Sequence, residues 1–92
     1  MSQTTQIAER RREIREPAAG QVILIVDSPL ALAIVARLID VSPDGFCASY
    51  ESRDLQRGDR VLFRYKDACG TAVVVWTRVA GRSVRAGFHL TT

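Results

Sequence analysis

The chain has few of the residues from which metal and redox centres are built. Its 92 residues include one histidine, His89, and two cysteines, Cys47 and Cys69, which stand far apart with no CxxC spacing. A structural zinc site needs about four Cys, His or acidic ligands. We therefore expect no metal site and no cofactor, and we expect both thiols to be reduced packing residues.

Long apolar stretches are also missing. No apolar run approaches the ~18 residues of a membrane-spanning helix. The N-terminal sequence MSQTTQIAERRREIREP has no apolar segment after its charges, so it does not have the pattern of a secretory signal. These absences predict a cytoplasmic protein without membrane insertion.

Groups for catalysis are scarce in the same way. Ser42 has no histidine near it in the sequence, and it stands in a turn whose plain role is backbone geometry. Asp40 and Asp44 flank that turn, where acidic side chains are usually solvated. The sequence therefore predicts a protein that is not an enzyme and has no catalytic residues.

What the chain does have is arginine. The net charge is +3, and all but one of the 13 basic residues are arginine, the exception being Lys66. A GC-rich genome would explain this bias without any function. The alternative is that some arginines use their planar fork to bind phosphates or bases, which lysine cannot imitate. A chain of this length forms one domain with a single core.

Most of the chain predicts short β-strands separated by turns. Val22 to Val26 is typical of a buried strand, whereas residues 28–39 fit either a helix opened by Ser28-Pro29 or a strand with apolar residues at every second position. Turns are expected at 42–45, 56–59, 67–70 and 80–81. Apolar residues alternate in the segments between and after these turns: Phe46, Ala48 and Tyr50; Val61, Phe63 and Tyr65; Val84, Ala86, Phe88 and Leu90.

This pattern predicts an all-β antiparallel barrel or sandwich. Trp76 lies in the strand-like stretch 71–78 and is expected in the core or the barrel wall rather than as a platform for a base. Arg78, Arg82 and Arg85 surround a predicted turn and are expected to be solvated. They would hold a phosphate only if the fold placed their hairpin beneath the N-terminal arm.

Two motifs stand above this background. Arg11 and Arg15 form an RxxxR pattern within residues 9–16, a segment with four arginines and three glutamates just before Pro17. Asp40, Ser42 and Gly45 form the pattern DxSxxG. Either motif alone is weak, because an RxxxR is usually a solvated charge pattern and DxSxxG also fits a capped turn.

Together, in this order and ahead of a short-stranded domain, the motifs closely resemble those of the PilZ family. The segments ERRREIREP, ARLIDVSPDGFCAS, LQRGDRVLFRY, VVVWTR and AGFHL extend the resemblance over nearly the whole chain. It implies a six-stranded antiparallel β-barrel at residues 17–92, preceded by a flexible arginine-rich arm at residues 1–16. It also favours the strand over the helix at residues 30–39.

The resemblance further implies a non-enzymatic receptor for cyclic di-GMP. It assigns ligand binding to Arg11, Arg15, Asp40, Ser42 and Gly45, with Arg10 as an additional contact that influences whether one nucleotide or a stacked pair binds. The residue types suit this ligand, because an arginine fork matches the O6 and N7 of guanine or a phosphate, and a carboxylate accepts hydrogen bonds from the opposite edge of guanine.

The implied mechanism is that the nucleotide clamps the arm onto the barrel and so changes a surface that contacts a protein partner. The outputs of the family include motility, exopolysaccharide production, attachment and virulence, so that partner would belong to flagellar or polysaccharide machinery. One alternative is a PilZ-fold protein-interaction module that binds no nucleotide. A small barrel that binds RNA or single-stranded DNA is another, disfavoured because the arginine segment has no interleaved aromatic residues.

Overall fold

The computed structural model describes residues 15–91, which form seven β-strands and no helix. The strands are β1 (Glu16–Pro17), β2 (Gln21–Val26), β3 (Ala33–Ser42), β4 (Gly45–Tyr50), β5 (Arg60–Tyr65), β6 (Ala68–Ala80) and β7 (Ser83–Thr91). The all-β prediction is confirmed.

Nothing helical within residues 15–91 has the length and apolar character that a membrane crossing requires.

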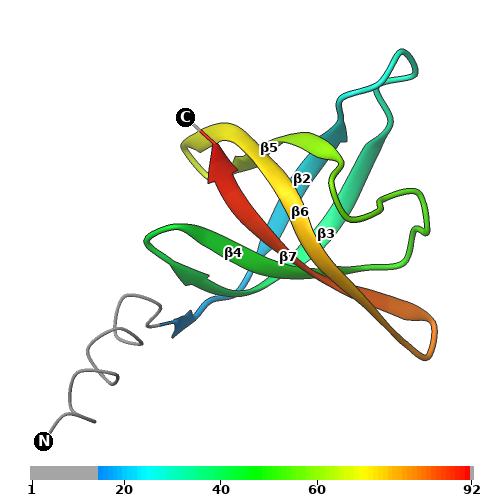
Figure 1. Cartoon of the computed structure of the whole chain (residues 1–92). Helices are drawn as coiled ribbons and strands as arrows, with labels where there is room; N and C mark the ends of the chain where they lie inside the picture. Colours follow the sequence, from blue (N-terminus) through cyan, green and yellow to red (C-terminus); the bar gives the residue numbers. More distant parts are fainter. Residues whose placement is uncertain (1–14, 92) are drawn as a thin grey trace, which may run out of the picture.

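Six of the strands close into a barrel (Figure 1). Each pairs antiparallel with the next in the order β3, β2, β5, β6, β7, β4, and β4 returns to pair with β3. The short β1 lies outside this ring on β3, where Pro17 is the register partner of Asp40. The predicted six-stranded antiparallel barrel is therefore correct, and β1 is an addition to it.

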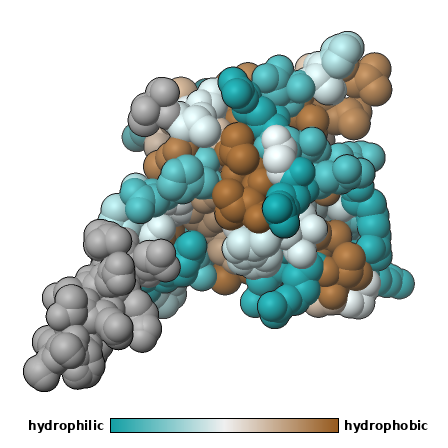
Figure 2. Space-filling model, viewed as in Figure 1, coloured by the Kyte–Doolittle hydropathy of each residue, from teal (hydrophilic) through white to brown (hydrophobic). Residues whose placement is uncertain are grey.

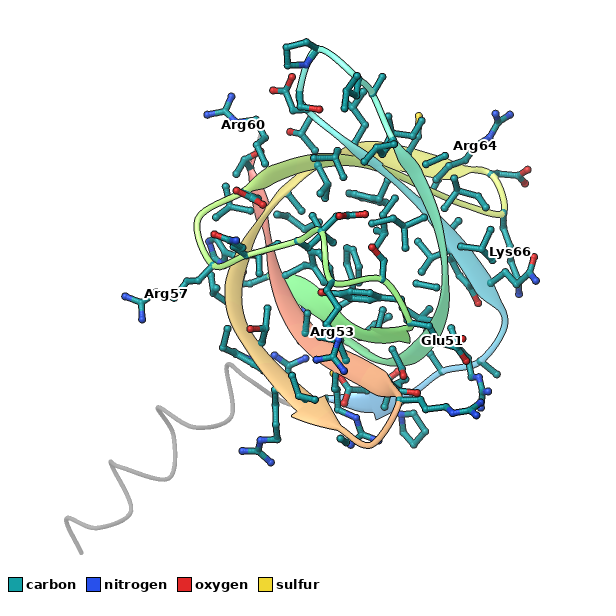
Figure 3. The ribbon with its side chains drawn as sticks, turned by 90° about the vertical axis from the view of Figure 1, so that its right-hand side faces the viewer. Glu51, Arg53, Arg57, Arg60, Arg64 and Lys66 are labelled. Atoms are coloured by element: carbon teal, nitrogen blue, oxygen red, sulfur yellow. The ribbon has the colours of Figure 1, made fainter. Side chains whose placement is uncertain are left out.

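Alternating side chains build the core of the barrel. Figure 3, viewed from the right-hand side of Figure 1, shows the strands as a ring around a filled interior, with Arg57, Arg60 and Arg64 pointing away from it. The inward positions are apolar on each of the six strands of the barrel, which is the period-two pattern expected of a sheet with one buried face. They include Val22, Leu24, Ile34, Ala36, Leu38, Phe46, Ala48, Tyr50, Val61, Ala72, Val74, Val84, Ala86 and Phe88, together with Leu55 from the loop between β4 and β5.

The segment that the sequence left open between helix and strand divides into a turn and a strand. Residues 27–32 form the β2–β3 connection, in which Ala31 has a φ of 47°, and β3 begins at Ala33. The predicted alternation is therefore wrong at its start: Leu30 is 76% exposed and Leu32 is 40% exposed. Figure 2 shows apolar colour at the upper right, where Figure 1 places this turn.

The turn predicted at residues 67–70 is shorter than expected. It occupies Lys66 and Asp67, with Lys66 at a φ of 54°, and β6 already begins at Ala68. Cys69 therefore lies in a strand and is exposed, which corrects its interpretation as a packing residue.

Two β-bulges decide which side chains reach the outer surface. In β3 the register shifts between Leu38 and Asp40, so Leu38 faces the core while Asp40 faces outward. In β6 the register shifts between Val74 and Trp76, so Val74 is buried and Trp76 lies on the outside. A bulge inserts one residue into a strand and so turns the following side chain to the other face. Both bulges thus supply the outer face with a polar or aromatic group.

Candidate binding site on the outer face of the barrel

One row of register partners crosses four strands on this outer face. Trp76 of β6 is opposite Gly87 of β7, Gly87 is opposite Cys47 of β4, and Cys47 is opposite Asp40 of β3. Directly opposite residues of neighbouring strands project from the same side of a sheet. The row therefore gathers an indole, a thiol and a carboxylate on one surface.

Asp40, at the end of the row, binds Arg15, the first residue that the structure describes. Arg15 Nη1 donates a hydrogen bond to Asp40 Oδ1 at 2.7 Å, within an ion pair. Both side chains keep access to solvent, with 42% of Arg15 and 25% of Asp40 exposed. A pair of this kind contributes about 0–1 kcal/mol to stability. A ligand could therefore replace either partner in this ion pair with little loss of folding free energy.

A concavity of about 480 Å³ lies over the row. Because three of its side chains are arginines and one is an aspartate, its polar lining is positively charged at neutral pH. The residues that line it are Arg15, Ile39, Asp40, Cys47, Trp76, Arg78 and Arg85.

Trp76 lies flat against a glycine. A Cβ atom at Gly87 would be 2.2 Å from Trp76 Nε1 and 2.5 Å from Cε2, so the indole rests directly on the Gly87 backbone. Trp76 nevertheless remains 38% exposed. Trp76 was expected in the core or in the barrel wall, and the structure places it in the wall, with its exposed ring surface in the concavity.

Cys47 forms part of the floor of the concavity. It is buried, as predicted for a packing residue. Burial raises the pKa of the Cys47 thiol and the Asp40 carboxylate raises it further, whereas Arg85 and Arg15 oppose the shift. A thiol with a raised pKa stays protonated near neutral pH and is a poor nucleophile. Cys47 therefore supplies shape rather than reactivity.

Arg78 and Arg85 are exposed, as the sequence predicted, and they also line the concavity. They are register partners on β6 and β7, two positions along these strands from Trp76 and Gly87. No carboxylate of residues 15–91 forms an ion pair with either of them. Alternation along β6 places Arg78 on the same face as Trp76. Because of the bulge between Val74 and Trp76, the sequence alone does not show that this face is the outer one.

The other predicted site residues are placed differently. Ser42 ends β3 and Gly45 begins β4, so the two residues flank the β3–β4 turn, and Ser42 Oγ lies 3.4 Å from the Gly45 carbonyl oxygen. They line a separate, mainly apolar cavity of about 230 Å³ at one end of the barrel. A Cβ at Gly45 would lie 1.9 Å from the Phe88 carbonyl oxygen, so close packing of β4 on β7 already requires glycine there. Arg10 and Arg11 lie outside the described residues.

Within the described part of the chain, no group of three or more His, Cys, Asp or Glu residues is arranged to hold a metal ion. Comparison of the sequence with models of known protein families and with curated protein sequences finds no match to either.

Proposed function

We propose that the protein is a non-enzymatic receptor for cyclic di-GMP. The observation that carries the proposal is the concavity in which Arg15, Asp40, Trp76 and two further arginines converge. The sequence supports it independently, since Arg15 and Asp40 belong to the two motifs that resemble those of the PilZ family.

Each group in the concavity has a counterpart in this ligand. An arginine fork can bind a phosphate or the O6 and N7 of a guanine, and the Asp40 carboxylate can accept hydrogen bonds from the N1–H and 2-amino group of another. The exposed face of Trp76 can stack on a purine. Binding would exchange the Arg15–Asp40 ion pair for contacts in which both groups bind the nucleotide instead.

The ligand would also change the protein surface around the site. Arg15 is the last residue of the RxxxR motif, and Glu16 already pairs with Val41 of β3, so a nucleotide bound by Arg15 and Arg11 would fasten the part of the arm before Arg15 to the barrel. That change, together with the two added phosphate charges, would alter a surface for a protein partner in motility, exopolysaccharide or biofilm control. The cytoplasm, where this second messenger acts, is the proposed location.

Calorimetric titration of the purified protein with cyclic di-GMP, GTP and a random single-stranded oligonucleotide tests the proposal. We expect saturable binding of cyclic di-GMP and much weaker binding of GTP, because one linear nucleotide does not present two guanines on a closed ring. Equal affinity for GTP would refute the specificity. Binding of none of the three would favour the alternative, a barrel that contacts proteins without a nucleotide, and preference for the oligonucleotide would favour a nucleic-acid-binding barrel.

A further inference from the structure

A second row of register partners runs beside the row that contains Trp76. Arg78 of β6 is opposite Arg85 of β7, Arg85 is opposite Ser49 of β4, and Ser49 is opposite Arg37 of β3. All four residues project from the outer face, so three arginines and a hydroxyl cross four adjacent strands. Three interstrand spacings separate the ends of this row, which is about 14 Å.

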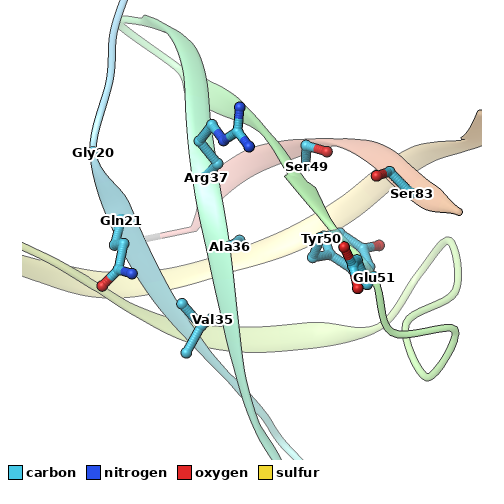
Figure 4. Close-up of a pocket in the computed structure, with 9 residues that line it drawn as sticks. All are labelled: Gly20, Gln21, Val35, Ala36, Arg37, Ser49, Tyr50, Glu51 and Ser83. Atoms are coloured by element: carbon cyan, nitrogen blue, oxygen red, sulfur yellow. The ribbon is translucent and has the colours of Figure 1, made fainter.

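The far end of the row lies in a second concavity of about 530 Å³ (Figure 4). Its walls carry the Arg37 guanidinium and the hydroxyl groups of Ser49 and Ser83, while Glu51 is the one carboxylate among its lining residues. The complete lining is Gly20, Gln21, Val35, Ala36, Arg37, Ser49, Tyr50, Glu51 and Ser83. Because Ser49 pairs with Arg85, this concavity adjoins the one described above.

The row is electrostatically unfavourable for the protein alone where Arg78 and Arg85 lie directly opposite each other. Like charges directly opposite each other on neighbouring strands destabilise a sheet. Within residues 15–91 the ion pairs include none formed by Arg37, Arg78 or Arg85. An anion on the row would offset this repulsion, and guanidinium and hydroxyl donors are the groups that bind phosphate oxygens.

We infer that Arg37, Ser49 and Ser83 form a second phosphate subsite, continuous with the first concavity through Arg85. The subsite takes a phosphodiester or phosphate group. Its identity as part of a cyclic dinucleotide rests on the proposed function, whereas its affinity for phosphate does not. The group comes either from the second phosphodiester of the bound nucleotide or from a second molecule bound beside it.

The subsite is tested by NMR titration of the full chain with inorganic pyrophosphate. We expect saturable shifts of the Ser49 and Ser83 amides and of Arg37 Nε–H, and an affinity about five- to tenfold lower in Arg37→Gln. Arg64→Gln is the matched control, because Arg64 is an exposed β5 residue that lines neither concavity. Glu51→Gln should tighten binding, since it removes the opposing charge without changing size.

Unshifted Ser49 and Ser83 resonances, or equal losses in Arg37→Gln and Arg64→Gln, would overturn the subsite. Calorimetry with cyclic di-GMP then identifies the source of the phosphate. If Arg37→Gln lowers affinity at an unchanged stoichiometry of one, the second phosphodiester of the same molecule occupies the subsite. If wild type binds two molecules and Arg37→Gln binds one, a second molecule does. Absence of any cyclic di-GMP binding alongside Arg37-dependent pyrophosphate shifts would refute the proposed function and leave the subsite standing.

Discussion

Gly87 shows how a residue without a side chain can set the geometry of the site. The Trp76 indole rests on its backbone, so a methyl group in Gly87→Ala must push the ring outward. Since Trp76 is the only tryptophan, its fluorescence reports this movement without interference. We expect a shifted emission maximum and cyclic di-GMP affinity reduced about fivefold or more, because base stacking on an aromatic ring contributes about 1–3 kcal/mol.

The control for this change is Gly70→Ala, whose Cβ would lie 3.1 Å from the Phe63 ring and meet nothing of Trp76. Its emission spectrum should match that of the wild type. An unaltered spectrum and affinity in Gly87→Ala would show that the indole does not depend on Gly87.

At Gly45, measurement can separate a role in strand packing from a role in ligand binding. Its added Cβ would collide with the Phe88 carbonyl oxygen, a backbone atom that moves only if β4 separates from β7. Gly45→Ala should therefore lower the free energy of unfolding by roughly 1–3 kcal/mol, measured by urea denaturation. The protein that remains folded should bind the ligand nearly normally. A fully stable Gly45→Ala protein without affinity would instead place the ligand against Gly45.

At the scale of elements, the β2–β3 hairpin separates apolar residues that support the fold from those that do not. Leu24 is completely buried, whereas Leu30 in the turn is 76% exposed. Leu24→Ala should lower the free energy of unfolding by about 2–5 kcal/mol, and Leu30→Ser should change it by less than about 0.5 kcal/mol in the same urea experiment. A large loss of stability in Leu30→Ser would mean that the turn packs against the barrel.

The strands could be predicted from sequence wherever apolar and polar residues alternate without interruption. The alternation of Phe46, Ala48 and Tyr50 gave their inward direction correctly, and that of Val84, Ala86 and Phe88 did so as well. The alternation of apolar residues also includes Leu30, which lies in a turn. Alternation alone does not show where a strand begins to pair with its neighbour, so the start of β3 could not be predicted.

The candidate site was only partly predictable for a related reason. Arg15 and Asp40 were identified from their motifs, and the structure brings them together. Trp76 and Arg78 were not, because a bulge next to Trp76 reverses the phase of β6 and depends on tertiary pairing with β7. The run of valines before Trp76 contains no local pattern that predicts the bulge.

The stability of the whole molecule should fall in alkaline solution. Burial raises the pKa of the Cys47 thiol above its ordinary value of 9.0, and burial followed by the nearby Asp59 raises that of Tyr50 above 10.0. Below these ordinary values both groups are protonated in the folded and unfolded chains. Above them the unfolded chain releases protons first, so the free energy of unfolding decreases as pH rises.

Urea denaturation between pH 7 and pH 11 measures this dependence. Tyr50→Phe is the informative variant, because the Tyr50 hydroxyl is buried without a hydrogen-bond partner among the described residues. The free energy of unfolding of Tyr50→Phe should decrease less steeply above pH 10 than that of the wild type. At pH 7 the two values should be nearly equal. A decline as steep as that of the wild type would assign the alkaline sensitivity to other groups.

The most direct test of the cyclic di-GMP site is calorimetric titration of wild type, Arg15→Ala and Arg15→Lys. Loss of a bidentate arginine contact worth about 1–3 kcal/mol predicts a 5- to 150-fold weaker affinity for Arg15→Ala. Lysine should restore only part of it, because it keeps the charge without the planar fork. The Arg15–Asp40 pair is exposed, so the free energy of unfolding should change by no more than about 1 kcal/mol. Wild-type affinity in Arg15→Ala would contradict the account, and so would weak binding explained entirely by unfolding.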